Sequence, residues 1–293
     1  MKLIHFLQDQ EPRVGVWTPQ GILDVTKAGQ TLNMAVPSTM QDIINQGQQG
    51  LDSLQALADK AQELNGEALY LEESSLHILP VLEQPEKLIC VGLNYMPHIQ
   101  EAKMEVPKSP VLFSKFNNAL AAHNEKVKLP ETAEKYDYEA EMVLVIGKEA
   151  KNVSQEEALS YVFGYSAGND LSARDLQLLT GQWFLGKSLD QFAPVGPYLV
   201  TADEVDPSNL EISCKVNGEV RQLANTKNMI FDCAYLVSYI SRYMTLKPGD
   251  LIFTGTPEGV ILGYPQDKQQ WLTAGDEVEV TIEGLGTLRN KLV

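Results

Sequence analysis

The chain has 293 residues but only three cysteines, Cys90, Cys214 and Cys233. Their number is odd, they lie far apart, and none forms a C-x-x-C pair. The sequence therefore suggests neither a disulfide framework nor a thiolate zinc site. A chain of this length can bury a core large enough to fold without covalent cross-links. We expect a reducing compartment, the cytoplasm.

Long apolar runs are missing as well. No stretch reaches the roughly 18 apolar residues that a membrane span requires. The opening segment, MKLIHFLQDQEPR, contains a short apolar run that Gln and Asp interrupt. We therefore expect no membrane partner.

Positive charge is scarce, because 23 Lys and Arg face 39 Asp and Glu, for a formal net charge of -16. Binding to nucleic acid needs clustered Lys and Arg, and no such cluster is visible, so we expect no nucleic-acid partner. A small anionic substrate would require a local reversal of potential. A bound divalent cation can supply it inside an acidic protein.

The patterning of the chain changes near residue 80. Before it, the strand-like segments RVGVW and GILDV flank a Pro-Gln-Gly turn, and apolar residues recur at helical spacing from Ser38 to Leu64. After it, short apolar runs separated by Gly, Pro, Asn and Asp predict strands, with helices only near 154–162 and 229–244. We predict a small α+β domain over residues 1–80 and a strand-rich α+β catalytic domain over residues 81–293.

The segment Asp137-Tyr138-Glu139-Ala140-Glu141 runs directly into the apolar sequence MVLVIG. Side chains two residues apart share one face of a strand, so Glu139 and Glu141 are expected to point the same way. Two carboxylates on a buried strand would protonate, pair with cations or share a metal, and oxygen ligands favour Mg²⁺, Mn²⁺ or Ca²⁺ over zinc. The alternative is a solvated strand end.

A second acidic element, Gly168-Asn169-Asp170-Leu171-Ser172, follows another apolar stretch. Asp170 would complete a set of three oxygen ligands and leave open positions for water and substrate. Taken alone, the same residues are equally typical of a turn or a helix cap.

Pro97 is a suitable first-turn residue, and a helix beginning there brings His98 and Glu101 onto one face. A carboxylate beside an imidazole fixes its orientation and raises its basicity, as a general base acting on water requires. A surface His-Glu pair is the alternative.

The segment Gly181–Ser188 matches the phosphate-binding pattern G-x-x-x-x-G-K-S letter for letter. Its context is wrong, because the preceding residues look helical and prolines follow. We therefore reject nucleotide binding and keep Lys187 as a cation that could meet an anionic substrate. The strand end Thr254-Gly255-Thr256 could offer donors to a carboxylate, or it could be only a turn.

Together these segments resemble the fumarylacetoacetate hydrolase family. The matching stretches occur in the family's order from about residue 86 to the C-terminus: GLNYMPHIQE, SPVLFSKF, DYEAEMVLVIGK, GYSAGNDLSARDLQ, GKSLDQFAPVGP, VNGEV and LKPGDLIFTGTPEGV. The resemblance implies a catalytic domain folded as a mixed β-sandwich roll, preceded by a small N-terminal α+β domain. It also implies a homodimer.

The resemblance further implies the site. One Mg²⁺ or Mn²⁺ per subunit would be held by Glu139, Glu141 and Asp170. Catalysis would involve His98, Glu101 and Lys187, with the His-Glu pair on a lid segment. The substrate, a small anionic 2-oxo acid, would be bound by residues in the shared motifs: Asn94, Tyr95, Arg174, Gln177 and Thr256.

From this resemblance we predict hydrolysis of a C–C bond in an acylpyruvate-type compound. The metal would chelate the substrate and act as a Lewis acid. His98, oriented by Glu101, would deprotonate a water molecule, and this water would attack the distal carbonyl of the substrate. Decarboxylation of oxaloacetate, or isomerisation of a dienoic 2-oxo diacid from aromatic catabolism, would use the same metal site. A homologue that binds ligand without catalysis is a third possibility.

Overall fold

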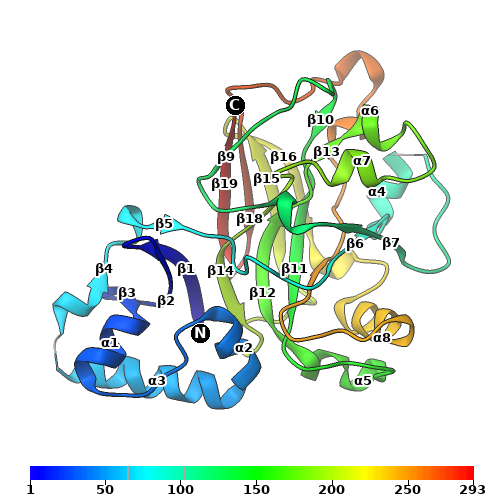
Figure 1. Ribbon diagram of the computed structural model, residues 1–293. Coiled ribbons are helices and arrows are strands. Elements are labelled where there is room, and N and C mark those ends of the chain that lie inside the picture. Colours follow the sequence, from blue (N-terminus) through cyan, green and yellow to red (C-terminus); the bar gives the residue numbers. More distant parts are fainter. Residues whose placement is uncertain (65, 102) are drawn as a thin grey trace.

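The computed structural model describes residues 1–64, 66–101 and 103–293 and shows a strand-rich α+β fold (Figure 1). Among these residues, no helix is both long enough and apolar enough to cross a membrane. The helices are α1 (Val25–Leu32), α2 (Met40–Gln46), α3 (Gln48–Glu63), α4 (Met96–Glu101), α5 (Gln155–Ala158), α6 (Arg174–Gln177), α7 (Phe184–Lys187) and α8 (Cys233–Tyr243).

The strands fall into one large sheet, one pair and one five-stranded sheet. Their bounds are β1 (Lys2–Gln8), β2 (Glu11–Thr18), β3 (Gly21–Asp24), β4 (Tyr70–Leu71), β5 (His77–Ile78), β6 (Leu88–Gly92), β7 (Val111–Lys115), β8 (Leu120–Ala121), β9 (Lys126–Val127), β10 (Tyr136–Asp137), β11 (Ala140–Ile146), β12 (Val162–Asn169), β13 (Ser172–Ala173), β14 (Ala193–Thr201), β15 (Glu211–Val216), β16 (Glu219–Asn225), β17 (Leu251–Phe253), β18 (Glu277–Ile282) and β19 (Gly286–Leu292).

The N-terminal segment forms the predicted hairpin, β2 and β3, but its helical part differs from the prediction. The single helix expected from Ser38 to Leu64 is two helices, α2 and α3, because Gly47 interrupts it with φ of 54°. The first of them is capped by the side chain of Thr39, which accepts from the backbone N–H of Asp42.

The large sheet has the order β4-β3-β2-β1-β14-β12-β11-β17-β6-β7. The sheet is mixed, because β17 runs parallel to β6. The neighbouring pairs β11–β12, β11–β17 and β12–β14 are antiparallel. Strand β1 pairs with β14, so the sheet continues across residue 80 without interruption. The division into residues 1–80 and 81–293 stays a prediction.

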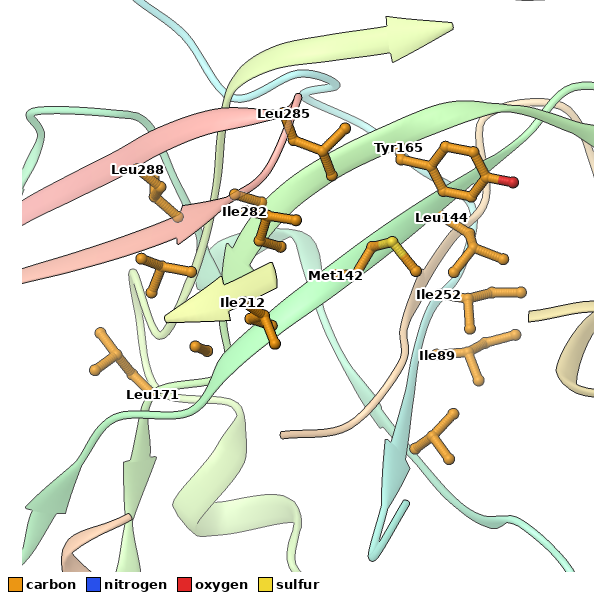
Figure 2. Close-up of a cluster of buried hydrophobic side chains, with 14 of the residues drawn as sticks. Ile89, Met142, Leu144, Tyr165, Leu171, Ile212, Ile252, Ile282, Leu285 and Leu288 are labelled. Atoms are coloured by element: carbon orange, nitrogen blue, oxygen red, sulfur yellow. The ribbon is translucent and has the colours of Figure 1, made fainter. Parts of the chain in front are cut away.

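The five-stranded sheet, β16-β15-β18-β19-β9, packs over the centre of the large sheet. Figure 2 shows apolar side chains of this core: Ile212 from β15 and Ile282 from β18 lie on one side of Met142 from β11, and Leu144 and Ile252 lie on its other side. These two facing sheets confirm the predicted strand-rich α+β class. The large sheet's other face packs on the helices of the N-terminal segment.

Alternation along β11 decides where its carboxylates point. Met142 and Leu144 belong to the core between the sheets, whereas Val143 and Val145 belong to the core on the opposite face. Because alternate side chains share a face, Glu141 lies on the side of Val143, away from the five-stranded sheet. The Glu141 carboxylate therefore lies on the face of the large sheet that also carries Val143 and Val145.

Close contact between β12 and β14 gives a test of this arrangement. A methyl group on Gly164 would lie 2.2 Å from the carbonyl oxygen of Val200, whereas one on Gly181 would meet nothing within 4 Å. Gly164→Ala should therefore lower the free energy of unfolding by about 1–3 kcal/mol, as overpacking does. Gly181→Ala is the matched control. Equal denaturation midpoints for the two variants would contradict the close packing of these strands.

Candidate metal centre and active site

Three carboxylates meet at the end of the β11–β12 pair. These strands are antiparallel, with Glu141 opposite Gly168, so Glu139 before β11 and Asp170 after β12 come together. The backbone N–H of Asp170 donates to the carbonyl oxygen of Glu139 over 2.9 Å. One oxygen from each of Glu139, Glu141 and Asp170 lies within 4.8 Å of the other two, and all three residues are buried.

Lys187, at the end of the short helix α7, bridges two of these carboxylates. Its Nζ donates to Glu139 Oε2 over 2.6 Å and to Asp170 Oδ2 over 2.8 Å. Burial alone would lower the pKa of Lys187, but Asp170 and Glu139 outweigh it and raise that pKa. The ammonium therefore stays charged inside the cluster. The segment Gly181–Ser188, whose sequence matches a phosphate-binding loop, thus places Lys187 against two carboxylates.

Lys115, at the end of β7, is a second buried cation that sequence reasoning missed. Its Nζ lies 2.5 Å from Asp170 Oδ1 and donates to the carbonyl oxygens of Leu171, over 3.0 Å, and Phe192. It lies in the quoted stretch SPVLFSKF, but nothing local indicated that its side chain points at an acid far along the chain.

Arg174 and Asp137 link the cluster to the loop after β17. The Arg174 guanidinium lies 2.8 Å from Asp137 Oδ2 and 2.8 Å from Glu139 Oε1. The Asp137 carboxylate, which is fully buried, also accepts from the backbone N–H groups of Ile261 and Leu262 over 2.8 and 3.0 Å. Asp137 was not predicted as a site residue, although it lies only two positions before the predicted ligand Glu139.

The carboxylates are not electrically equivalent. Burial, reinforced by Asp170 and Glu139, raises the pKa of Glu141 well above its usual range. Burial would also raise the pKa of Glu139, but Lys187 and Arg174 outweigh it and hold that pKa below its usual range. The single backbone donor recorded for Glu141 among the described residues is the N–H of Gly255, at 2.7 Å. Glu141 is therefore the carboxylate with the least cationic compensation.

The predicted His-Glu pair forms on α4. His98 Nδ1 lies 2.9 Å from Glu101 Oε1, and both carboxylate oxygens of Glu101 accept from the backbone N–H of Gly259, at 3.2 and 3.0 Å. A side chain on Gly263 would overlap this carboxylate, with its Cβ 2.4 Å from Glu101 Cδ. The helix is thus docked against the loop after β17. Since Nδ1 is engaged, Nε2 is the ring nitrogen that a substrate can reach.

A cavity of about 80 Å³ joins the pair to the carboxylates. His98, Glu139, Glu141 and Lys187 all line it. Apolar side chains complete the wall: Val91, Leu93, Met104, Phe113, Leu178, Trp183, Val260 and Leu262. A larger hollow of about 930 Å³ over the N-terminal segment contains none of the predicted site residues.

The predicted substrate-binding residues divide into two groups. Arg174, Gln177 and Thr256 line the cavity, whereas Asn94 and Tyr95 do not. The Asn94 amide is occupied by backbone: it donates to the carbonyl oxygens of Phe231 and Thr254 and accepts from the N–H of Phe231. The structure therefore gives Asn94 a scaffolding position behind the site.

The donor set fits a hard divalent cation. All three candidate ligands offer carboxylate oxygens, which Mg²⁺ and Mn²⁺ prefer. Glu141 accepts only the backbone N–H of Gly255 among the described residues, and no Lys or Arg of the described residues is paired with it. Buried oxygens with unused acceptor capacity are what a metal ion would satisfy.

Residues 87–293 match the family described as fumarylacetoacetate (FAA) hydrolase C-terminal. The chain belongs to the fumarylacetoacetate hydrolase family. The resemblance seen in the seven motifs is thereby confirmed.

Relatives within the fumarylacetoacetate hydrolase family match the whole chain. A Rattus norvegicus protein named oxaloacetate tautomerase Fahd2a, mitochondrial, is 39% identical over 299 residues, covering 100% of this chain and 92% of that protein. The structure of fumarylacetoacetate hydrolase from psychrophilic Exiguobacterium antarcticum is 33% identical to this chain, with a TM-score of 0.81. The structure of maleylpyruvate hydrolase from Sphingobium sp. SYK-6, in complex with manganese (II) ion and pyruvate, is 29% identical, with a TM-score of 0.79. Each covers 100% of this chain and 99% of its own.

The crowding of acids at Glu141 generates a prediction. Glu141→Gln should raise the thermal midpoint of the metal-free protein, because it removes a buried charge that its neighbours oppose. It should also remove the stabilisation that Mn²⁺ gives the wild type, about 2.7 kcal/mol at a hundred times the dissociation constant. Thermal unfolding with and without Mn²⁺ measures both effects.

Glu149→Gln, in an exposed position beyond the far end of β11, is the matched control and should leave both quantities unchanged. A Glu141→Gln variant that Mn²⁺ stabilises as much as it does the wild type would contradict the assigned ligand set.

Proposed function

We propose that the protein is a metal-dependent enzyme that interconverts the keto and enol forms of oxaloacetate or a similar 2-oxo diacid. One observation carries the proposal: the oriented base His98 lines the same cavity as the clustered carboxylates Glu139 and Glu141. The name of the Rattus norvegicus relative supports the choice of substrate.

Charge in the cluster favours an anionic ligand once a cation is bound. Four carboxylates, from Asp137, Glu139, Glu141 and Asp170, face three cations, from Lys115, Arg174 and Lys187. With every group ionised, one negative charge is uncompensated, and a divalent cation would reverse its sign. Such a local reversal gives an acidic protein an attractive site for a dianion.

Tautomerisation moves one proton and breaks no C–C bond. In the enol-forming direction, His98 Nε2 removes a proton from C3 of the substrate as the C2–C3 double bond forms, and the resulting imidazolium gives that proton to the 2-oxo oxygen. Glu101 holds the imidazole and stabilises the imidazolium that results. A bound Mg²⁺ or Mn²⁺ would act as a Lewis acid on the 2-oxo oxygen. Lys187 supplies a fixed positive charge beside it.

The apolar lining of the cavity favours proton transfer as well. The docking of Glu101 on Gly259 positions α4 beside the cavity, and apolar side chains such as Leu93, Val260 and Leu262 line its wall. Exclusion of water strengthens the electrostatic interactions inside and limits competing attack by water. Keto–enol exchange needs no water at the distal carbon, whereas hydrolysis does.

Hydrolysis of an acylpyruvate, the reaction predicted from the sequence, is the second candidate. The His98–Glu101 pair favours it, because the same imidazole could deprotonate a water molecule. The solved maleylpyruvate hydrolase with manganese and pyruvate shows that a family member with this fold carries a hydrolase name. The site geometry is common to both reactions, so the substrate decides between them.

Two further expectations accompany the proposal. We retain Mg²⁺ or Mn²⁺, one per subunit of a homodimer, as the cofactor. We also retain the cytoplasm as the compartment, although the name of the Rattus norvegicus relative contains the word mitochondrial.

Rates measured with the two substrates test the proposal. With Mn²⁺, the wild type should accelerate the keto–enol exchange of oxaloacetate above the buffer rate, followed by ultraviolet absorbance. His98→Ala should lower that enzymatic rate on the order of 10²–10⁴-fold, the range typical of a general acid–base group. His77→Ala, at an exposed position remote from the cavity, is the control and should match the wild type.

Release of pyruvate from an acylpyruvate is followed in parallel. Hydrolysis without acceleration of tautomerisation would select the second candidate. If the wild type accelerates neither reaction, the enzymatic proposal is wrong, and an unchanged rate in His98→Ala would remove the imidazole from the mechanism.

A further inference from the structure

Gln222 is a buried polar residue on a strand that is otherwise partly or fully exposed. It is 1% exposed, and no other residue of β16 is classed as buried. The register between β15 and β16 passes from Cys214 opposite Gln222 to Lys215 opposite Val220, which leaves Arg221 as an extra residue. Such a bulge re-aims the next side chain, and here it turns Gln222 inward.

The Gln222 amide joins two parts of the candidate site. Its Oε1 accepts from the backbone N–H of Ala140, at 3.0 Å, between the predicted ligands. Its Nε2 donates to the Thr256 hydroxyl over 2.9 Å and to the Pro257 carbonyl oxygen over 2.9 Å. The two halves of the amide cannot be exchanged, because a backbone N–H can only donate and a carbonyl can only accept.

This fixed amide determines the direction of the Thr256 hydroxyl. Because Nε2 has only hydrogens to offer, Thr256 Oγ1 must be the acceptor in that contact. The hydroxyl's own hydrogen is therefore directed elsewhere, and Thr256 lines the cavity. A hydroxyl aimed in this way is a hydrogen-bond donor to an anion.

The loop that carries Thr256 is held closely against the strand. Gly259 has φ of 98°, and a Cβ there would lie 2.1 Å from the carbonyl oxygen of Arg221. Only glycine permits this approach, which keeps the 256–259 loop within reach of the Gln222 amide.

We propose that Gln222 is a positioning residue that fixes Thr256 as a donor to the carboxylate of the bound 2-oxo acid. The inference rests on the proposed function, because it assumes that the cavity takes such an anion. Gln222 itself does not line the cavity, so it acts through Thr256 and through the strand of the predicted ligands.

A double-mutant cycle tests the proposal through ligand binding. Calorimetry would measure the dissociation constant of oxalate, a small 2-oxo acid analogue, with Mn²⁺-saturated wild type, Gln222→Met, Thr256→Val and the double variant. Thr256→Val should weaken oxalate binding about tenfold or more, as loss of a hydrogen bond to a charged group does. Gln222→Met should weaken it about three- to tenfold, the cost of a hydroxyl no longer held in place.

The decisive result is non-additivity. If Gln222 acts through Thr256, adding Gln222→Met to Thr256→Val should weaken oxalate binding less than about twofold further. If the two effects multiply instead, Gln222 does not act through this hydroxyl and the inference is wrong. If the wild type does not bind oxalate in the presence of Mn²⁺, the proposed function fails first, so the two failures are distinguishable.

Two further variants separate positioning from general damage. Asn290→Leu removes another buried amide of the same sheet, which donates to the carbonyl oxygens of Ala122 and Glu125; it should lower the thermal midpoint without changing the oxalate dissociation constant. Gln222→Asn keeps an uncharged amide but is one methylene shorter, so it cannot hold Ala140 and Thr256 together. It should weaken oxalate binding as Gln222→Met does, and this weakening should disappear in the Thr256→Val background. Wild-type affinity in Gln222→Asn and Gln222→Met would overturn the inference.

Discussion

The structure depends on the burial of several carboxylates at one end of the β11–β12 pair. Buried like charges oppose one another and lose hydration, so this arrangement would be unstable without compensation. Lys187 and Lys115 contact Asp170, and Arg174 contacts Glu139, whereas Glu141 receives only a backbone donor among the described residues. With every group ionised, four carboxylates face three cations. The residual negative charge supports the proposal that the cluster holds a metal ion.

The fold brings a different element to each side of this cluster. The large sheet supplies the carboxylates, α4 brings His98, the loop after β17 brings Thr256, and the five-stranded sheet contributes Gln222 from behind. Figure 1 shows α4, α6 and α7 gathered on one side of the molecule, away from the N-terminal helices. The site is therefore built from segments that are distant in sequence. Its precision depends on the packing between the two sheets.

Some residues of the candidate site could be predicted from the sequence, and others could not. Alternation placed Glu139 and Glu141 together, because strand periodicity is local, whereas Asp170 became a convincing partner only through the family resemblance. Lys115 and Gln222 were missed because each contacts residues that are distant in the sequence. In addition, Gln222 points inward at a β-bulge, which the sequence pattern did not predict. Asn94 lies in a shared motif, yet its amide binds backbone. The motifs could not separate hydrolysis, decarboxylation and isomerisation, because all three reactions would use the same metal site.

The most direct test of the central claim is a crystal structure with Mn²⁺ and oxalate, using anomalous scattering to locate the metal. The account predicts one anomalous peak among the carboxylates of Glu139, Glu141 and Asp170. It also predicts oxalate in the cavity, within hydrogen-bond distance of the Thr256 hydroxyl. Manganese at any other position, or Lys187 still bridging Glu139 and Asp170 with no metal among the three carboxylates, would contradict it.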